Sequence, residues 1–175
     1  MTDLPIEVAG EADLAALHAL IEAAYRGDSA RRGWTHEADL LDGQRTDMEA
    51  LAAIVDDPRQ RMLVARQPSR LVGCIQLTLR NGGVGYLGLL AVDPDIQANG
   101  LGARLLAAAE TCLATQLGAS TVEMTVIRQR VELIAYYQRR GYVLTGEIRH
   151  LPPGLGQLRD DITLLVMAKV LPPSA

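Results

Sequence analysis

The chain has 175 residues, of which 49% are hydrophobic and 22% are charged, and its formal net charge is -4 at pH 7. This composition is typical of a globular protein, and no apolar run reaches the roughly 20 residues that a membrane span needs. The acidic balance argues against an electrostatic nucleic-acid binder, which usually carries a strong basic excess. We therefore expect one globular domain over residues 1–175, and the lack of a basic and apolar leader pattern after Met1 predicts a cytoplasmic protein.

The first part of the chain is predicted to contain one strand and two helices. Residues 4–8 have the pattern of a short strand, and residues 13–25 carry apolar side chains at helical spacing. The polar stretch 27–44 is expected to form a loop with a short helix. Thr46 to Glu49 matches a capping box, so a second helix is expected over residues 47–55.

The central part of the chain changes to the two-residue period of β-strands. Residues 62–65, 71–79 and 84–92 are separated by turn-forming residues, which predicts a meander of three antiparallel strands. The elements expected after it are a helix over 102–116, a strand over 121–127, a helix over 132–140, and strands over 142–148 and 164–170. The last strand is expected to close the sheet. This order predicts an α/β (α+β) fold, with a mixed, largely antiparallel sheet of six to seven strands and helices on both faces.

The most informative segment is the glycine-bearing loop between the strand that ends at Val92 and the next helix. Asp93-Pro94 stops the strand, because proline removes a backbone donor. Gln97 to Gly102 then stands at a helix N-terminus, where the first backbone N–H groups lack intrahelical partners and the helix dipole is positive. A phosphate group can accept hydrogen bonds from several such amides. Glycines at positions 100 and 102 would let the backbone approach that ligand closely.

Two other phosphate-binding motifs fit this loop poorly. A P-loop needs a lysine after its second glycine, and the only lysine of the chain is Lys169, far from any such loop. A Rossmann fingerprint needs a third glycine where this chain has Leu105. Glu123 does lie near the distance of a ribose-binding acid, so dinucleotide binding stays open through that residue alone.

Three segments together carry a resemblance to a known family. Gln97, Gly100 and Gly102 match the pattern Q/R-x-x-G-x-G/A, the sequence Leu-Ala-Val-Asp-Pro stands just upstream, and the segment from Tyr137 to Tyr142 reads Tyr-Gln-Arg-Arg-Gly-Tyr. In these segments the chain resembles the GNAT family of acyl-CoA-dependent N-acetyltransferases, and the resemblance covers most of the chain after residue 60. It implies acetyl-CoA as co-substrate and an amine as acceptor.

The resemblance also implies where the cofactor lies. In the family, the backbone edge of the fourth strand pairs with the pantetheine arm of CoA, and a bulge there separates this strand from the fifth. Gly85 and Gly88 fit this picture, because glycine often marks a bulge or a close ligand. Arg130 stands where the family often has asparagine, so it either reaches a cofactor phosphate or lies in solvent. The predicted cofactor-binding residues are Leu90, Ala91, Val92, Gln97, Ala98, Asn99, Gly100, Leu101, Gly102, Ala103 and Arg130.

Tyr137 matches the general acid of the family. A phenol has a pKa near 10 and a thiol a pKa near 8.5, so a tyrosine hydroxyl can protonate the departing CoA thiolate at modest cost. The base that deprotonates the amine is harder to find, because the fourth strand contains no carboxylate between Tyr86 and Val92. Glu123 on the fifth strand is the catalytic candidate that we pair with Tyr137. Glu37, His36 and a water relay without a dedicated base remain alternatives.

The acceptor pocket is expected to include the segment between the first two helices. There Trp34 offers an apolar wall, and His36 and Glu37 offer polar contacts, although Trp34 could equally anchor the loop on the core. A small-molecule amine is favoured over a protein, and the net charge mildly favours a cationic or neutral acceptor. Because the strand carboxylate is missing, a non-catalytic acyl-CoA sensor is the competing hypothesis.

The two cysteines are expected to be buried free thiols. Cys74 falls in a strand pattern and Cys112 in a helix, without the spacing of a metal or redox pair, so we predict neither a disulfide nor a metal site. Nucleic acid and membrane are not expected partners, and a homodimer is left open.

Overall fold

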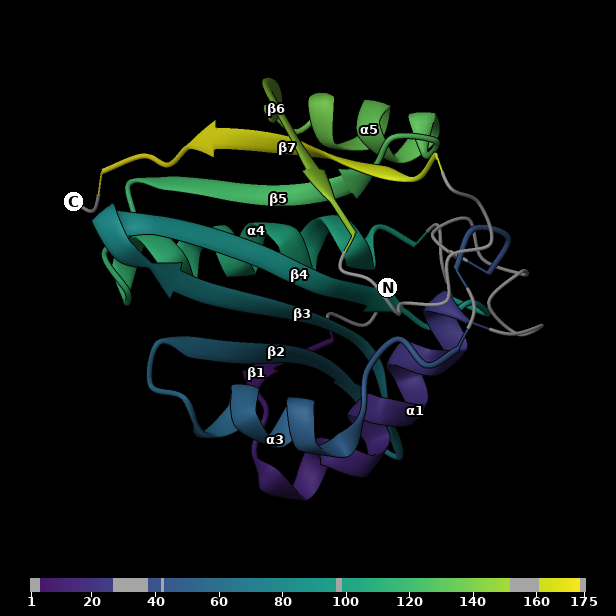
Figure 1. Cartoon of the computed structure of the whole chain (residues 1–175). Helices are drawn as coiled ribbons and strands as arrows, with labels where there is room; N and C mark the ends of the chain where they lie inside the picture. Colours follow the sequence, from purple (N-terminus) through teal and green to yellow (C-terminus); the bar gives the residue numbers. More distant parts are fainter. Residues whose placement is uncertain (1–3, 27–37, 42, 97–98, 152–160, 174–175) are drawn as a thin grey trace.

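The computed structural model describes residues 4–26, 38–41, 43–96, 99–151 and 161–173. Each strand and helix predicted outside residues 27–44 is present (Figure 1). In chain order the elements are β1 (Ile6–Val8), the short helix η1 (Glu11–Asp13), α1 (Leu14–Tyr25), α3 (Met48–Asp56), β2 (Gln60–Gln67), β3 (Arg70–Arg80), η2 (Asn81–Gly83), β4 (Val84–Val92), α4 (Leu101–Thr115), β5 (Thr121–Ile127), α5 (Val131–Gln138), β6 (Val143–His150) and β7 (Thr163–Val170).

The strands form one seven-stranded sheet in the order β1-β2-β3-β4-β5-β7-β6. β4 and β5 pair in parallel and the other neighbours pair antiparallel, which confirms the predicted mixed, largely antiparallel sheet. The expectation that the last strand closes the sheet is wrong, because β7 lies between β5 and β6. Burial explains the order: Val166 and Met167 of β7 are buried, as an inner strand requires, whereas β6 exposes most of its side chains.

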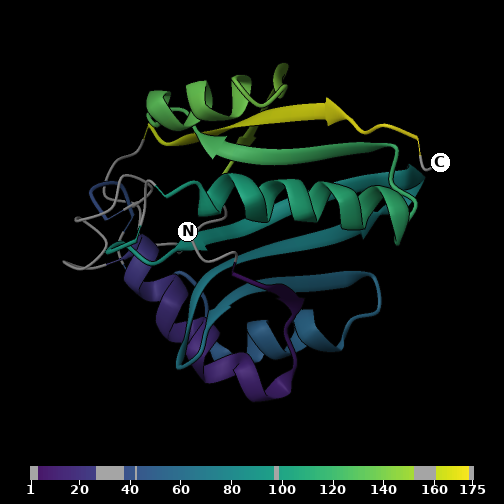
Figure 2. The ribbon, with the colours of Figure 1, turned by 180° about the vertical axis from the view of Figure 1, so that it is seen from behind.

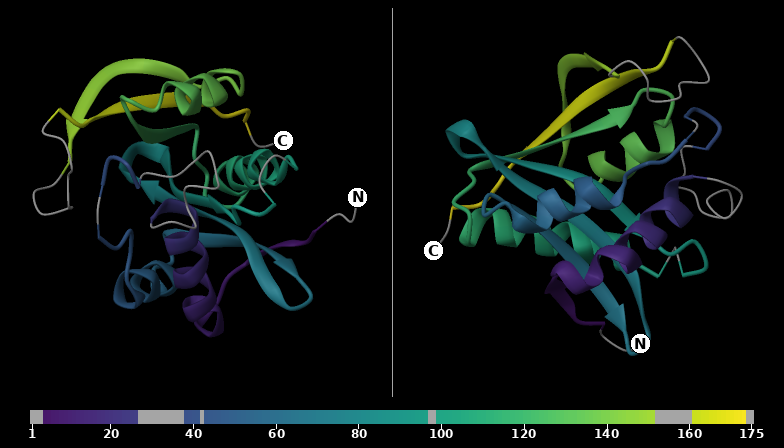
Figure 3. Two further views of the ribbon diagram at one scale, coloured as in Figure 1. Left: turned by 90° about the vertical axis from the view of Figure 1, so that its right-hand side faces the viewer. Right: turned by 60° about the horizontal axis from the view of Figure 1, so that its bottom comes forward.

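Helices cover both faces of the sheet (Figures 2 and 3). Leu17 of α1 and Leu51 of α3 pack with Met62 and Val64 of β2 on one face. On the opposite face, α4 and the buried Tyr137 of α5 belong to a separate and larger hydrophobic cluster. No helix in the described part of the chain is long and apolar enough to cross a membrane.

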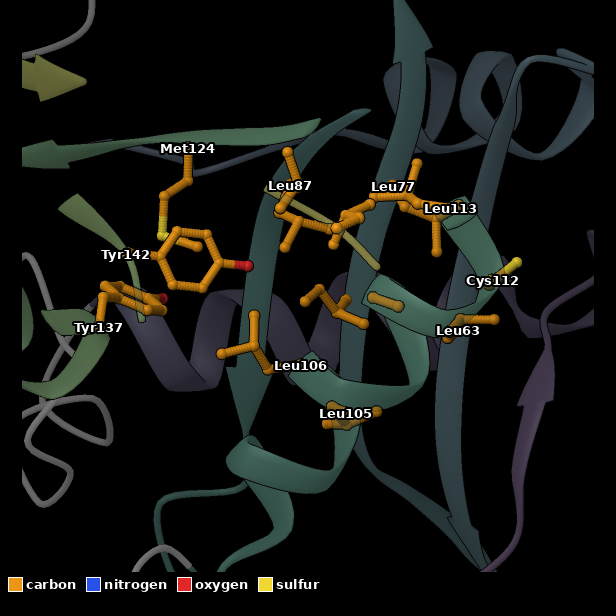
Figure 4. Close-up of a cluster of buried hydrophobic side chains, with 14 of the residues drawn as sticks. Leu63, Leu77, Leu87, Leu105, Leu106, Cys112, Leu113, Met124, Tyr137 and Tyr142 are labelled. Carbon is orange, nitrogen blue, oxygen red and sulfur yellow. The ribbon is translucent and has the colours of Figure 1, made fainter. Parts of the chain in front are cut away.

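The larger cluster lies between α4 and the sheet (Figure 4). Leu105, Leu106 and Leu113 of α4 are at most 2% exposed and pack in one cluster with Leu87 of β4. Gly85 belongs to this packing, because a Cβ atom at that position would lie 2.7 Å from Leu113 Cδ1. The sequence-based interpretation of Gly85 as the mark of a ligand or bulge is therefore wrong, since the side chain of α4 fills that space.

The start of α3 differs by one residue from the predicted capping box. The carboxylate of Asp47 accepts a hydrogen bond from the backbone N–H of Ala50 at 2.8 Å, so Asp47 is the N-cap. Thr46 has another role, because its backbone N–H donates to Glu22 Oε1 at 3.0 Å. The backbone N–H of Arg45 donates to the same oxygen at 2.7 Å, so Glu22 of α1 fixes the segment that leads into α3.

Cys74 and Cys112 are both free and buried, as predicted. The buried thiol of Cys74 is expected to make the stability of the fold sensitive to alkaline pH. Burial raises the pKa of the Cys74 thiol to about 12, whereas an unfolded cysteine titrates near about 8.5. The thiol has a higher pKa in the folded protein than in the unfolded chain. Its contribution to the free energy of unfolding is therefore intact below about pH 8.5 and is lost as the pH rises toward about 12. At about pH 10 we expect a loss of roughly 2 kcal/mol of unfolding free energy from this thiol.

Urea unfolding of the wild type and of Cys74→Ala, each at about pH 7 and about pH 10, measures this effect. The fall in unfolding free energy between the two pH values should be about 2 kcal/mol smaller in the variant. The comparison between pH values removes the constant cost of the cavity that the substitution leaves. The same pH dependence in both proteins would contradict the burial of the thiol.

Candidate active site

β4 and β5 separate after a short parallel contact. Their pairing covers only residues 84–86 and 121–123, and beyond it the two strands diverge (Figure 1). In the same part of β4, the pairing with β3 shifts register between Cys74 and Gln76, and Leu89 has a φ of 47°. An extra residue in one strand and a left-handed backbone angle are the marks of a β-bulge. The expected bulge and strand separation are therefore both present.

A cavity of about 290 Å³ lies at this opening. On the side of α4 and α5 its lining includes Ile75, Leu87, Leu106, Met124, Leu133 and Tyr137. On the side of α1 its lining includes Tyr25, Arg26, Leu41, Arg45, Tyr86 and Thr125. Because successive side chains of a strand point to opposite faces, the neighbours Tyr86 and Leu87 belong to different walls. The cavity thus passes through the sheet where β4 and β5 part, and it joins the two faces.

Tyr137 lies on the α5 side of this cavity and is 7% exposed. Its ring makes edge contacts with Tyr136 and Tyr142, with centroid distances of 5.3 and 5.8 Å, and Figure 4 shows Tyr137 beside Tyr142. Burial raises the pKa of the Tyr137 hydroxyl far above that of a free phenol. The hydroxyl therefore holds its proton at neutral pH. Its neighbour Tyr136 is half-buried and is not among the described residues that line the cavity.

The glycine-bearing loop leads directly into the first turn of α4. Gly100 is the N-cap residue and has a left-handed φ of 76°, which glycine adopts without strain. Gly102 has an ordinary φ, and a Cβ atom there would lie 3.4 Å from the Tyr136 hydroxyl and 3.8 Å from Val92 Cγ2. Those are normal van der Waals distances, so the fold has room for a small side chain at position 102. Gln97 and Ala98 lie outside the described residues, while Asn99 and Gly100 are exposed.

The remaining predicted cofactor residues surround the bulge and the loop. Leu90 and Arg130 line the cavity, Ala91 and Val92 are buried at the end of β4, and Leu101 and Ala103 stand in the first turn of α4. Arg130 reaches the cavity from the N-cap position of α5. The structure thus brings together those predicted cofactor-binding residues that it describes. They lie at the bulged end of β4 and at the neighbouring N-termini of α4 and α5.

The bulge is held from the opposite face by α1. The hydroxyl of Tyr25 donates a hydrogen bond to the Leu90 carbonyl, which links the last residue of α1 to the bulged part of β4. The guanidinium of Arg45 lies over the Tyr25 ring at 5.1 Å from its centroid. Because Glu22 accepts from the backbone of the same segment, Arg45 is held by α1 at two points. The sequence pattern identifies Tyr25 only as the end of a helix, and no local motif marks Arg45.

The predicted base Glu123 is not among the described residues that line the cavity. One of its carboxylate oxygens lies 3.4 Å from an Arg149 guanidinium nitrogen and 3.9 Å from an Arg80 guanidinium nitrogen. The cavity instead contains Thr125, two residues further along β5, whose hydroxyl is 2.9 Å from that of Tyr86. The other expected acceptor-side residues, Trp34, His36 and Glu37, lie outside the described residues.

The comparisons with known proteins agree with this geometry. The family model of the acetyltransferase (GNAT) domain matches residues 35–151. The ribosomal-protein-S18-alanine N-acetyltransferase of Escherichia coli is 19% identical over 99% of this chain and 97% of its own, with a TM-score of 0.72. A chimera of the spermidine N-acetyltransferase SpeG from Vibrio cholerae and hSSAT is 16% identical over 97% and 96%, with a TM-score of 0.70.

An acetyltransferase of the GNAT family from Streptococcus pneumoniae is 19% identical over 97% of this chain and 100% of its own, with a TM-score of 0.69. No curated protein sequence matches the chain. At these identities the solved structures establish the fold, and the family model adds the sequence signal that they lack. The chain therefore belongs to the GNAT family and is an N-acetyltransferase.

Proposed function

We propose that the protein transfers the acetyl group of acetyl-CoA to the amine of a small molecule, by direct attack within a ternary complex. The observation that carries this proposal is the cavity, because it joins the two faces of the sheet where β4 and β5 part. A cofactor held on the α4 side can then present its thioester to an amine that enters from the α1 side. A cavity of about 290 Å³ suits the reacting ends of two small groups, which favours acetyl over a long acyl chain.

The start of α4 is the proposed site of the CoA phosphates. The first backbone N–H groups of this 15-residue helix lack intrahelical partners, and the helix dipole adds positive potential there. We assign the phosphates to the loop from Gln97 to Ala103 and the pantetheine arm to the backbone of Leu90, Ala91 and Val92. Arg130 adds a positive charge at the neighbouring start of α5. Spermidine and a ribosomal protein are the acceptors named for two similar structures, and neither is assigned to this chain.

The proposed reaction forms one C–N bond and breaks one C–S bond. The amine nitrogen attacks the thioester carbonyl carbon, and a backbone N–H at the bulge near Leu90 donates to the oxygen as it becomes negative. Collapse of the tetrahedral intermediate releases the CoA thiolate. Tyr137 gives its hydroxyl proton to the thiolate sulfur, and the amine nitrogen loses one proton, so the protons balance once the phenolate is reprotonated.

The burial of Tyr137 has two opposing consequences for this step. The raised pKa keeps the proton on the oxygen, which a general acid needs before the reaction. The same raised pKa makes donation costlier, by about 1.4 kcal/mol for each pKa unit above that of the sulfur. A substrate that fills the cavity also excludes water from the thiolate, and desolvation raises the pKa of the thiol in the same direction. The pKa values of the Tyr137 hydroxyl and the CoA thiol therefore come closer together only when both groups lie in the cavity from which the substrate excludes water.

Deprotonation of the amine is proposed to use water rather than a dedicated base. The described residues that line the cavity include no carboxylate and no histidine. The Tyr86 and Thr125 hydroxyls, 2.9 Å apart on the acceptor side, can hold a water molecule next to the amine. Glu123 stays the alternative predicted from the sequence, together with the undescribed His36 and Glu37.

Replacing Glu123 with glutamine separates these alternatives. With a water relay we expect kcat/KM to fall by less than about tenfold, whereas loss of a general base costs about 10²–10⁴-fold. The rate should be measured between about pH 6 and 9, where a water relay lets kcat/KM rise with the free-amine fraction of the acceptor. Glu147→Gln is the matched control, because Glu147 pairs with the same Arg149 at 2.7 Å. A loss of about 100-fold or more in Glu123→Gln alone would identify Glu123 as the base.

A further inference from the structure

A cluster of polar and charged side chains that the proposed reaction does not use links α4 to β7. Its centre is Glu110 of α4, which accepts one hydrogen bond on each carboxylate oxygen. The hydroxyl of Tyr142 donates to Oε1 at 2.8 Å, and the ammonium of Lys169 donates to Oε2 at 2.7 Å. Glu110 and Lys169 are half-buried, and Tyr142 is buried. Glu110 therefore connects α4 both to β7 and to the residue that precedes β6.

Lys169, the only lysine of the chain, also contacts the turn between α5 and β6. A Cβ atom at Gly141 would lie 3.5 Å from Lys169 Cε, so the stem of the lysine packs over this turn. The ammonium at the end of the stem pairs with Glu110. Hydrogen bonds between charged groups are short and directional, and partial burial protects them from competing water. The cluster therefore fixes the turn relative to α4.

Tyr142 carries this connection to Tyr137 by two routes. The rings of the two tyrosines meet edge to face, with their centroids 5.8 Å apart. The backbone N–H of Tyr142 also donates to the carbonyl of Tyr137 at 3.2 Å. The hydroxyl of Tyr142 is directed away from Tyr137, as its bond to Glu110 requires (Figure 4). One end of Tyr142 thus contacts the proposed general acid, and the other end is bound to α4.

The two helices that this cluster connects have different parts in the proposed reaction. The start of α4 is the proposed site of the CoA phosphates, and α5 carries Tyr137. Proton transfer needs the donor within hydrogen-bond reach of its acceptor, and a misplacement of about 1 Å can lower the rate by about 100-fold. Apolar contacts alone give little directional control. A directional link between the helices therefore bears on the rate of the chemical step.

We propose that Glu110 and Lys169 are positioning residues that act through Tyr142, and that they keep the Tyr137 hydroxyl in register with the thioester of a cofactor bound at α4. This inference rests on the proposed function, because it takes Tyr137 as the general acid. Its consequence is a division of effects. Loss of the cluster slows the chemical step, whereas the affinity for acetyl-CoA stays close to that of the wild type.

Tyr142→Phe tests the link directly, because it keeps the ring beside Tyr137 and removes only the hydrogen bond to Glu110. The single-turnover rate of acetyl transfer should fall by about 3–30-fold, while the dissociation constant of acetyl-CoA stays within about twofold. The control Cys112→Ala removes a buried side chain elsewhere on α4 and should lower the melting temperature without this loss of rate. A wild-type single-turnover rate in Tyr142→Phe would overturn the proposal.

A double-mutant cycle with Tyr137→Phe separates positioning of the acid from a general weakening of the fold. When the Tyr137 hydroxyl is already absent, adding Tyr142→Phe should change the single-turnover rate by less than about twofold. The stability cost of Tyr142→Phe should persist in both backgrounds, because the bond to Glu110 is lost in each. An equal loss of rate with and without the Tyr137 hydroxyl would overturn the proposal.

Nuclear magnetic resonance of the CoA-bound protein, labelled with ¹³C-tyrosine, gives a readout without turnover. The ring signal of Tyr137 is the one that Tyr137→Phe removes. Lys169→Met keeps the stem over Gly141 and loses the ammonium, so it should shift the Tyr137 signal through Glu110 and Tyr142. An unchanged signal would overturn the proposal. Failure of the proposed function looks different: the signal would shift, yet the wild type would release no thiol or Tyr137→Phe would keep the wild-type rate.

Discussion

Replacing Tyr137 with phenylalanine is expected to lower the single-turnover rate of acetyl transfer by about 10²–10⁴-fold, the usual contribution of a general acid. The ring remains, so its edge contacts with Tyr136 and Tyr142 and its burial should persist. Affinity for acetyl-CoA should change little, because only a hydroxyl is lost. Slow product release could hide a change in the chemical step when kcat is measured. Rapid-quench kinetics at saturating acetyl-CoA avoids this, because it measures the chemical step directly.

Tyr136→Phe is the matched control for this experiment. It removes the hydroxyl of the neighbouring tyrosine, whose side chain is not among the described residues that line the cavity. Because a Cβ atom at Gly102 would lie 3.4 Å from the Tyr136 hydroxyl, any effect of the control should appear in acetyl-CoA affinity rather than in the chemical step. Wild-type single-turnover rates in Tyr137→Phe would refute the assignment of this residue as the acid.

Valine at position 102 is expected to weaken CoA binding by about 10–100-fold, the equivalent of one or two charge-assisted hydrogen bonds. The side chain would stand in the first turn of α4, where the phosphates are proposed to approach the backbone N–H groups. The fold should survive, because neighbours of a Cβ atom there lie at 3.4 Å or more. Calorimetric titration with CoA measures the affinity, and thermal unfolding checks that the variant is folded.

Two further variants make this test specific. Gly102→Ala adds a single methyl group and should weaken CoA binding less than Gly102→Val does. Gly100 is a poorer position to test, because its φ of 76° would strain any other side chain and confuse binding with stability. Wild-type affinity for CoA in folded Gly102→Val would place the phosphates away from this loop.

Most elements of the fold could be predicted because hydrophobic period, turns and caps are local signals. The three-strand meander from β2 to β4 and the helix after the glycine-bearing loop occur where the sequence predicts them. The spatial order of the last two strands is not a local property. β7 inserts between β5 and β6 because its buried Val166 and Met167 suit an inner strand, and no turn or spacing in the sequence encodes that choice.

The candidate site likewise contains residues that the sequence could predict and residues that it could not. Tyr137 and the loop before α4 could be predicted because short motifs carry them. Tyr25 and Arg45 could not, because they reach the cavity only through the packing of α1 against β4 and the hold of Glu22 on the next segment. The roles of Trp34, His36 and Glu37 and the cytoplasmic location stay predictions from the sequence, and a homodimer stays open.

Direct acetyl transfer is tested by measuring thiol release from acetyl-CoA by the wild-type protein with a panel of small amines, and by identifying the product by mass. We expect one thiol for each N-acetylated amine, and intersecting double-reciprocal plots, because both substrates must be bound before the chemistry occurs. Parallel plots with an acetylated protein would contradict direct attack. Firm CoA binding without acetylation of any amine would contradict the proposed function and favour the acyl-CoA sensor.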